Sequence, residues 1–143
     1  MKKLGIIVCL LCVSLAMFSQ VSEQQLQGKQ WLAEEGFWAS DVIDFFMHFD
    51  NQKMTFTFRE KGKDKVCASY TYSYYLSPTK ETSFDVTKVG KDQKGNYIVL
   101  NREYVLGDKT KTDFLVYEIL GVSDSNLRIN AQGIKISLIV TDN

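Results

Sequence analysis

The chain has little of the residue types that most often build metal sites or cross-links. Its 143 residues include one histidine, one proline and three cysteines, and two of the cysteines lie within residues 1–12. A single histidine gives only a weak zinc pattern. Cys67 stands alone in the rest of the chain, so no internal disulfide is expected after the first residues. Stability must therefore come from a hydrophobic core.

The sequence also lacks the patterns of the common catalytic classes. It contains neither a serine-hydrolase elbow nor a glycine-rich phosphate loop. The acidic pairs Asp41/Asp44 and Glu34/Glu35 have no surroundings that mark them as glycosidase carboxylates. The chain neighbours of Cys67 carry no charge that would activate its thiol, so we expect a packed or half-buried cysteine. We predict no catalytic residue, no metal and no cofactor, and a protein that is not an enzyme.

The single histidine, His48, has carboxylates close by in the sequence. Asp44 lies four residues before it and Asp50 two residues after it. Asp44 and His48 would share a face in either a strand or a helix. This spacing permits a ligand pair or a general base, but we expect a structural or surface histidine.

The only long apolar run lies at the amino terminus. Two lysines precede residues 4–18, which carry no charge. The run is too short and too near the start for a membrane-spanning helix, and it is typical of a secretory signal. Small residues permit cleavage after Ala16 or Ser19, and we favour Ser19. We therefore expect residues 1–19 to be a signal peptide, and the protein to be exported to a periplasm or outside the cell.

The remaining 124 residues carry nearly balanced charge. They hold 15 basic and 17 acidic side chains, a net charge of −2. This balance argues against nucleic acid as a partner. No second apolar run is long enough for a transmembrane segment. A chain of this length suits one domain with its own core.

Alternation of apolar and polar side chains dominates the rest of the chain and predicts β-strands. The clearest case is residues 53–59, where Met54, Phe56 and Phe58 share one face. Residues 42–49 fit either a strand or two turns of helix. The strands expected from the pattern are residues 28–34, 42–49, 53–59, 66–76, 83–89, 96–106, 112–120, 126–130 and 134–141.

Short polar loops join most of these segments and favour sequential hairpins. Pro78, the only proline, ends the strand at 66–76. Closing the sheet removes its exposed edges. We therefore predict an all-β fold, a single antiparallel up-and-down barrel of eight or nine strands over residues 28–143, after a flexible lead-in of residues 20–27. Such a barrel fills its interior with side chains or holds one small ligand.

Three parts of the chain resemble the bacterial lipocalin-like proteins, small secreted barrels of the calycin type. They are LQGKQW at 26–31; FDV, KVG and GNYIV within 84–99; and YEIL, SDSN and LRI within 117–129. The resemblance implies a cup-shaped barrel that can bind an apolar ligand. It also implies that a late basic residue, Arg128 or Lys135, packs over the Trp31 ring in a cation–π contact.

Aromatic side chains supply the candidate ligand contacts. Facing inward, the stripe of tyrosines in 66–76 would offer hydroxyls to a ligand. Facing outward, the stripe would be a surface for a protein or glycan. The third alternative is an ordinary core or cross-strand ladder of aromatic rings with no binding role. Phe37 and Trp38 follow the first strand in a loop that either covers a ligand or partner, or plugs the barrel. The predicted ligand-binding residues are Phe37, Trp38, Met54, Phe56, Phe58, Tyr70, Tyr72 and Tyr74.

These observations predict a secreted, non-catalytic binding protein with a small, partly apolar ligand in a lipocalin-like barrel. The alternative is an exported protein-binding module, such as a protease inhibitor. Its contacts would be residues 20–27 and the loop that carries Phe37 and Trp38.

Overall fold

The computed structural model describes residues 20–91 and 93–141, so the expected signal peptide at 1–19 lies outside the described residues. The described part forms eight strands and two 3₁₀ helices. None of its helices is long and apolar enough to cross a membrane. The strands are β1 (Gln30–Glu35), β2 (Ile43–Phe49), β3 (Lys53–Glu60), β4 (Val66–Ser77), β5 (Tyr97–Leu106), β6 (Lys109–Val122), β7 (Asn126–Ala131) and β8 (Ile134–Thr141), and the helices are η1 (Glu23–Gln25) and η2 (Val86–Lys88).

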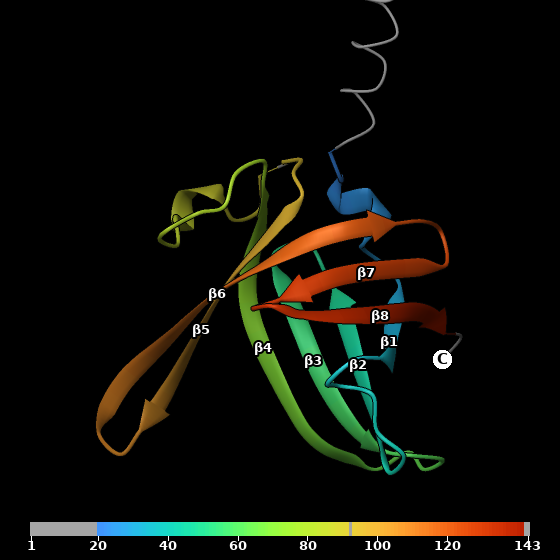
Figure 1. Cartoon of the computed structure of the whole chain (residues 1–143). Coiled ribbons are helices and arrows are strands. Elements are labelled where there is room, and N and C mark those ends of the chain that lie inside the picture. Colours follow the sequence, from blue (N-terminus) through green and yellow to red (C-terminus); the bar gives the residue numbers. More distant parts are fainter. Residues whose placement is uncertain (1–19, 92, 142–143) are drawn as a thin grey trace, which may run out of the picture.

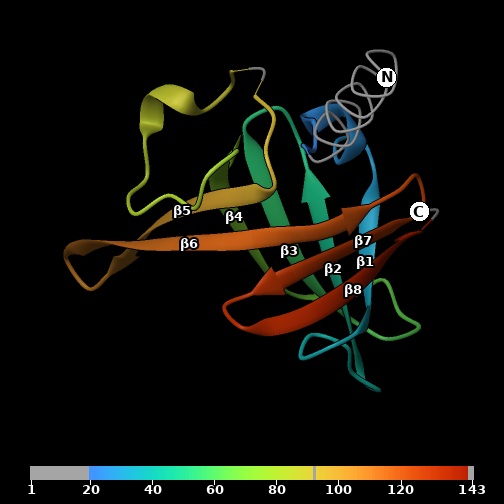
Figure 2. The same ribbon diagram turned by 45° about the horizontal axis from the view of Figure 1, so that its top comes forward.

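Each strand pairs antiparallel with the next strand in the sequence, and β1 pairs with β8 to close the sheet (Figures 1 and 2). The predicted all-β, up-and-down barrel is therefore confirmed, with eight strands. The β7–β8 turn shows how the chain reverses so tightly. Gln132 and Gly133 both have positive φ, 56° and 91°, as the type I′ turns that suit the strand twist require.

Side chains alternate between the barrel interior and the outer surface along each strand. At the end nearest residues 20–29, the inward side chains are buried and form a packed core. The side chains there with no exposed surface include Leu26, Trp31, Phe49, Met54, Tyr74, Leu76, Ile98 and Leu127. We call this end the closed end.

Residues 20–27 help to seal the closed end and are not the flexible lead-in that the sequence suggests. Val21 and Leu26 are buried in the core. The Trp31 Nε1 donates a hydrogen bond to the Leu26 carbonyl at 3.1 Å, and the Gly95 N–H donates to the Val21 carbonyl at 2.8 Å. The sequence did not predict this packing, because Val21 and Leu26 stand among glutamines and a charged residue. In the structure, η1 turns both apolar side chains toward the core.

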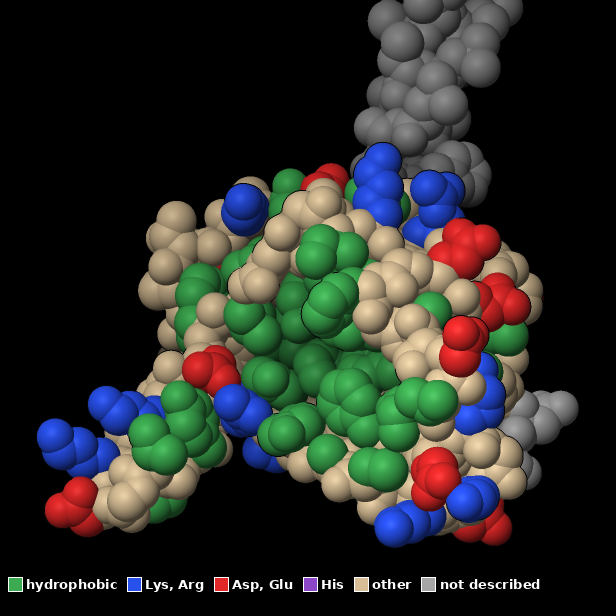
Figure 3. All heavy atoms as spheres, turned by 60° about the horizontal axis from the view of Figure 1, so that its bottom comes forward, with side chains coloured by type: hydrophobic (Ala, Val, Ile, Leu, Met, Phe, Trp, Pro, Cys, Tyr) green, Lys and Arg blue, Asp and Glu red, His purple; other side chains and the backbone are tan. Residues whose placement is uncertain are grey.

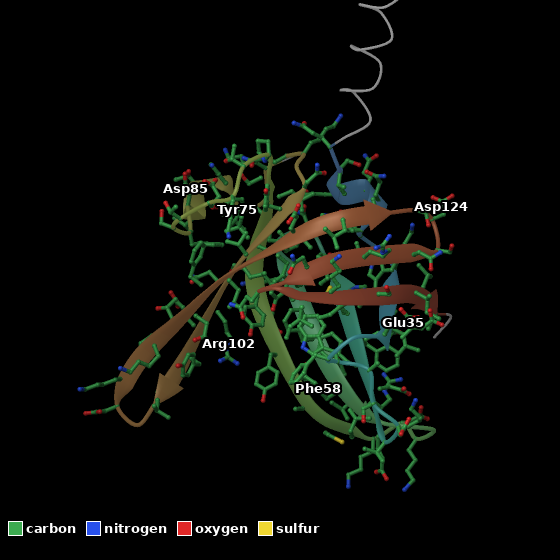
Figure 4. All side chains as sticks on the ribbon, in the orientation of Figure 1. Glu35, Phe58, Tyr75, Asp85, Arg102 and Asp124 are labelled. Carbon is green, nitrogen blue, oxygen red and sulfur yellow. The ribbon has the colours of Figure 1, made fainter. Side chains whose placement is uncertain are left out.

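The predicted strand at 83–89 is wrong. This segment lies in the long connection between β4 and β5 and contains η2. The Asp85 carboxylate caps η2 by accepting the Thr87 N–H at 3.0 Å. The Asp85 N–H donates to the Tyr75 hydroxyl at 3.1 Å, which fastens the loop to the outer face of β4 (Figure 4). Since β4 and β5 pair directly with each other, the ladder has no edge there for another strand.

Cys67 is exposed, and the expectation of a packed or half-buried thiol is wrong. Phe58 faces Ala68 while Arg59 faces Val66, so Cys67 is the extra residue of a β-bulge. The bulge also moves Val66 out of the apolar row of β4, and Val66 is half-exposed.

Strands β5 and β6 extend beyond the barrel wall. β4 pairs with β5 only as far as Asn101, and β7 pairs with β6 only from Tyr117 onward. Residues 102–106 and 109–113 therefore pair only with each other. We call this hairpin the arm; it projects to the lower left in Figure 1. It leaves the barrel open at this end, which we call the mouth, and the loop at 36–42 and the β3–β4 turn complete its rim.

We expect Leu26→Ala to lower the free energy of unfolding by about 3 kcal/mol, because it leaves a cavity in the closed end. Gln24→Ala is the matched control, since Gln24 is exposed on the same segment, and should change stability by less than about 0.5 kcal/mol. Urea unfolding followed by tryptophan fluorescence measures both variants. Equal stability of the two would mean that residues 20–27 do not support the core.

Candidate ligand-binding site

The mouth is hollow and lined with apolar side chains. Figure 3 shows the molecule from this side, with apolar side chains gathered around a central recess. Large apolar side chains at this end of the barrel are also exposed, among them Phe37 at 76%, Tyr70, Leu106 and Ile134. A recess lined with apolar groups and rimmed by exposed ones is the usual form of a binding site.

Seven aromatic rings meet at the mouth, each with its centroid within 6.4 Å of at least one other. They come from β2, β3, β4, β6 and the loop at 36–42, and the strand residues converge because they occupy inward positions of neighbouring strands. We call this group the mouth cluster. Its members are Trp38, Phe45, Phe56, Phe58, Tyr70, Tyr72 and Tyr117.

Trp38 packs against three rings of the mouth cluster. Its ring stacks on Phe45 with the centroids 4.4 Å apart, and it lies 5.8 Å from both Phe56 and Tyr117. Trp38 belongs to a loop, so it could leave the mouth without breaking any strand pairing. Trp38 therefore acts as a plug, whereas its neighbour Phe37 lies exposed at the rim.

The structure brings five of the eight predicted ligand-binding residues together at the mouth: Trp38, Phe56, Phe58, Tyr70 and Tyr72. The other three lie elsewhere. Phe37 is at the outer rim, while Met54 and Tyr74 are fully buried at the closed end. Tyr74 packs against Phe49 at 5.4 Å, and its hydroxyl accepts a hydrogen bond from Gln27 at 3.3 Å. These two residues are core.

Three mouth residues were missed from the sequence: Phe45, Tyr117 and Arg102. Phe45 lies in the segment that fitted either a strand or a helix, so its face was undetermined. Tyr117 lies in a strand that is apolar on both faces. Arg102 could have been found, because it continues the inward row of Ile98 and Leu100 on β5.

Arg102 brings a positive charge to the inner side of the mouth. It lies where the arm leaves the barrel, on the side toward β4 (Figure 4). Its guanidinium carbon is 5.1 Å from the Tyr70 ring, 5.5 Å from Tyr72 and 4.7 Å from Tyr104. Its Nη2 donates to the Asp113 carboxylate, directly opposite on β6. Its Nε is buried and has no hydrogen-bond partner among the described residues.

The mouth also contains two tyrosine hydroxyls held in the protonated form. Burial raises the pKa of Tyr117, and the neighbouring Tyr72 raises it further. Burial raises the pKa of Tyr72 as well, partly offset by Arg102. No hydrogen bond within residues 20–91 and 93–141 uses either hydroxyl. Both are therefore neutral groups that can donate to a ligand.

His48 and Asp44 do not form a site. Both lie on the outer face of β2, four residues and therefore about 13 Å apart. The His48 Nδ1 is 3.1 Å from the Lys29 carbonyl, and Asp44 pairs with Lys61 at 3.6 Å. The described part of the chain holds no group of three or more His, Cys, Asp and Glu side chains that could bind a metal.

The cation over the Trp31 ring is Lys29, whose Nζ lies 5.4 Å from the ring centroid. The expectation that Arg128 or Lys135 fills this role is wrong. Both are exposed at positions that alternate with the inward residues of β7 and β8, whereas Trp31 faces the interior.

No protein-family model matches the chain, and no curated protein or solved structure matches it either. The lipocalin-like resemblance therefore stays a prediction from the sequence.

The buried tyrosines predict a loss of stability in alkali. Burial raises the pKa of Tyr74 to about 12, against about 10 in an unfolded chain. A tyrosine with a raised pKa stabilises the fold fully below the unfolded value, and this contribution is lost as pH rises through the folded value. We expect the free energy of unfolding to fall between about pH 10 and 12, and to fall less in Tyr74→Phe and Tyr117→Phe.

Urea unfolding at a series of pH values measures this dependence, with absorbance near 295 nm reporting tyrosine ionisation. The same pH dependence in wild type and both variants would contradict the assigned burial of these hydroxyls.

Proposed function

We propose that the protein is an exported, non-catalytic binding protein that holds a small, partly apolar ligand at the mouth of its barrel. The observation that carries the proposal is Trp38. This loop residue sits as a plug on the mouth cluster, and Figure 3 shows an apolar recess at this end of the molecule.

The two ends of the barrel have different roles: the closed end supports the fold, and the mouth binds the ligand. The closed end is packed and gives the inward residues of the mouth fixed positions. At the mouth, aromatic faces supply apolar contact, while Tyr72, Tyr117 and Arg102 supply polar groups. Apolar walls with a few convergent polar groups are typical of small-molecule sites. A ligand that displaces Trp38 would take over its contacts with Phe45 and Phe56.

Export is supported by the uncharged run at 4–18 behind two lysines. The up-and-down barrel of eight strands suits the lipocalin-like resemblance, and a barrel of this size can hold one small ligand. Because a fold alone does not decide a function, the proposal rests on the mouth.

The alternative, a protein-binding module, has less support. Its proposed contacts at residues 20–27 include Val21 and Leu26, which are buried in the core, so engaging a partner through this segment would require it to detach from the barrel. Phe37 remains as an exposed aromatic contact beside the mouth.

The uncharged fluorescent probe N-phenyl-1-naphthylamine tests the mouth directly. We expect wild type to bind the probe and Trp38→Ala to bind it several-fold more tightly, because the plug is gone. Tyr72→Glu should abolish binding, since it replaces an aromatic wall of the mouth with a charged group beside Arg102. Leu120→Glu is the matched control at an exposed position of β6 and should bind like wild type.

Circular dichroism checks that each variant is folded. If folded Tyr72→Glu binds the probe like wild type, the mouth is not the site. Unchanged affinity in Trp38→Ala would show that Trp38 does not compete with a ligand.

Native mass spectrometry of the protein from its own source should show an added small-molecule mass that is released on unfolding. We expect the added mass to be retained, because a ligand held beneath the mouth rim should dissociate slowly. Protein with no added mass, recovered without denaturation, would instead favour a protein partner at the exposed Phe37.

A further inference from the structure

Arg102 has more hydrogen-bonding capacity than the structure uses. A guanidinium carries five N–H donors in a planar fork, and one of them, on Nη2, binds Asp113. The Nε–H is buried and has no partner among the described residues. Because an unsatisfied buried donor is unfavourable, its position calls for an acceptor that the surrounding side chains do not supply.

Other donors surround the same space. The Tyr72 ring lies 5.5 Å from the guanidinium carbon, and its hydroxyl is protonated and makes no hydrogen bond within the described chain. On the arm, Lys109 and Lys111 alternate in register with Asp113 and lie on the same face of β6. No ion pair of the described residues involves either lysine. The inner side of the arm is therefore rich in donors and positive charge.

We propose that Arg102 is the anchor for a carboxylate on the ligand, so that the ligand is an apolar chain or ring system with one anionic end. This inference rests on the proposed function, because it assumes that a small molecule occupies the mouth. The apolar part lies along Phe56 and Phe58. The carboxylate accepts hydrogen bonds from the Arg102 guanidinium and the Tyr72 hydroxyl.

The charge of the mouth favours an anion over a cation. Three tyrosine rings around one point could hold a cationic ligand, but the Arg102 guanidinium already occupies that point and would repel it. Hydrogen bonds between a guanidinium and a carboxylate are charge-assisted and stronger than neutral ones. They strengthen further where aromatic side chains exclude water.

Asp113 acts as an internal competitor in this arrangement. Its carboxylate already binds Nη2 of Arg102, so a ligand carboxylate must either displace it or bind beside it. In both cases, removing the negative charge of Asp113 should strengthen binding of an anionic ligand and leave an uncharged one unaffected.

Two probes with the same chain and different ends test the anchor: decanoate and decan-1-ol, compared by calorimetry at about pH 7.5. We expect wild type to bind decanoate about tenfold more tightly than decan-1-ol. Arg102→Gln should remove that preference, because it should lower the affinity for decanoate far more than the affinity for decan-1-ol. Asp113→Asn should tighten decanoate binding alone.

Arg59→Gln is the matched control. The Arg59 Nε is also buried without a partner in the described structure, and its guanidinium carbon lies 4.9 Å from the Phe46 ring. It occupies the outer face, opposite Asp44, so its replacement should leave both affinities as in wild type. This control distinguishes the effect of losing any partly buried arginine from the effect of losing the proposed anchor.

Equal binding of the two probes by wild type would overturn the anchor and leave the proposed function standing. So would a preference for decanoate that persists in folded Arg102→Gln. If neither probe nor N-phenyl-1-naphthylamine binds wild type, the proposed function fails and the anchor fails with it. If Arg102→Gln does not fold, Asp113→Asn decides, because unchanged decanoate affinity in that variant would overturn the anchor.

Discussion

The pairing of β1 with β8 is the contact on which the rest of the structure depends. It joins Trp31 to Val140 across almost the whole described chain, so its formation must overcome a large loss of chain entropy. Trp31 repays part of that cost, because its ring is fully buried and its Nε1 binds the Leu26 carbonyl. Once this ladder closes, the inward side chains of all eight strands face one another. Core and mouth both result from this closure.

Unequal strand lengths then create the mouth. β4, β5 and β6 have 12, 10 and 14 residues, whereas β1 and β7 have six each. In a closed barrel, a strand can pair only along the length of its neighbouring strands. Any residues beyond that length extend past the barrel wall. The surplus of β5 and β6 becomes the arm. The surplus of β2, β3 and β4 carries inward aromatic residues at this end of the barrel, and Trp38 packs against two of them, Phe45 and Phe56.

Alternation in the sequence was enough to predict the barrel, because period two appears in most of its strands and turn residues separate them. It failed where structure depends on contacts distant in sequence. Nothing local to residues 20–27 shows that Val21 and Leu26 reach the core, and 83–89 has strand-like composition but no strand edge to join. The candidate site was partly predictable for the same reason. The inward row of β3 was visible, whereas the position of Arg102 at the mouth depends on where β4 and β5 separate.

The mouth and the closed end differ in how their polar side chains are paired, and this difference suggests why the mouth contains polar residues. Stability alone would favour a leucine at position 102, continuing the inward row of Ile98 and Leu100, because an arginine there leaves a buried N–H unpaired and requires Asp113 to balance its charge. The Tyr72 and Tyr117 hydroxyls likewise make no hydrogen bond within the described chain, and phenylalanine would fill the same space. At the closed end, by comparison, the buried Tyr74 hydroxyl accepts a hydrogen bond from Gln27. The mouth therefore holds an arginine N–H without a partner among the described residues, next to tyrosine hydroxyls that make no hydrogen bond there, and a ligand with its own polar end would satisfy them.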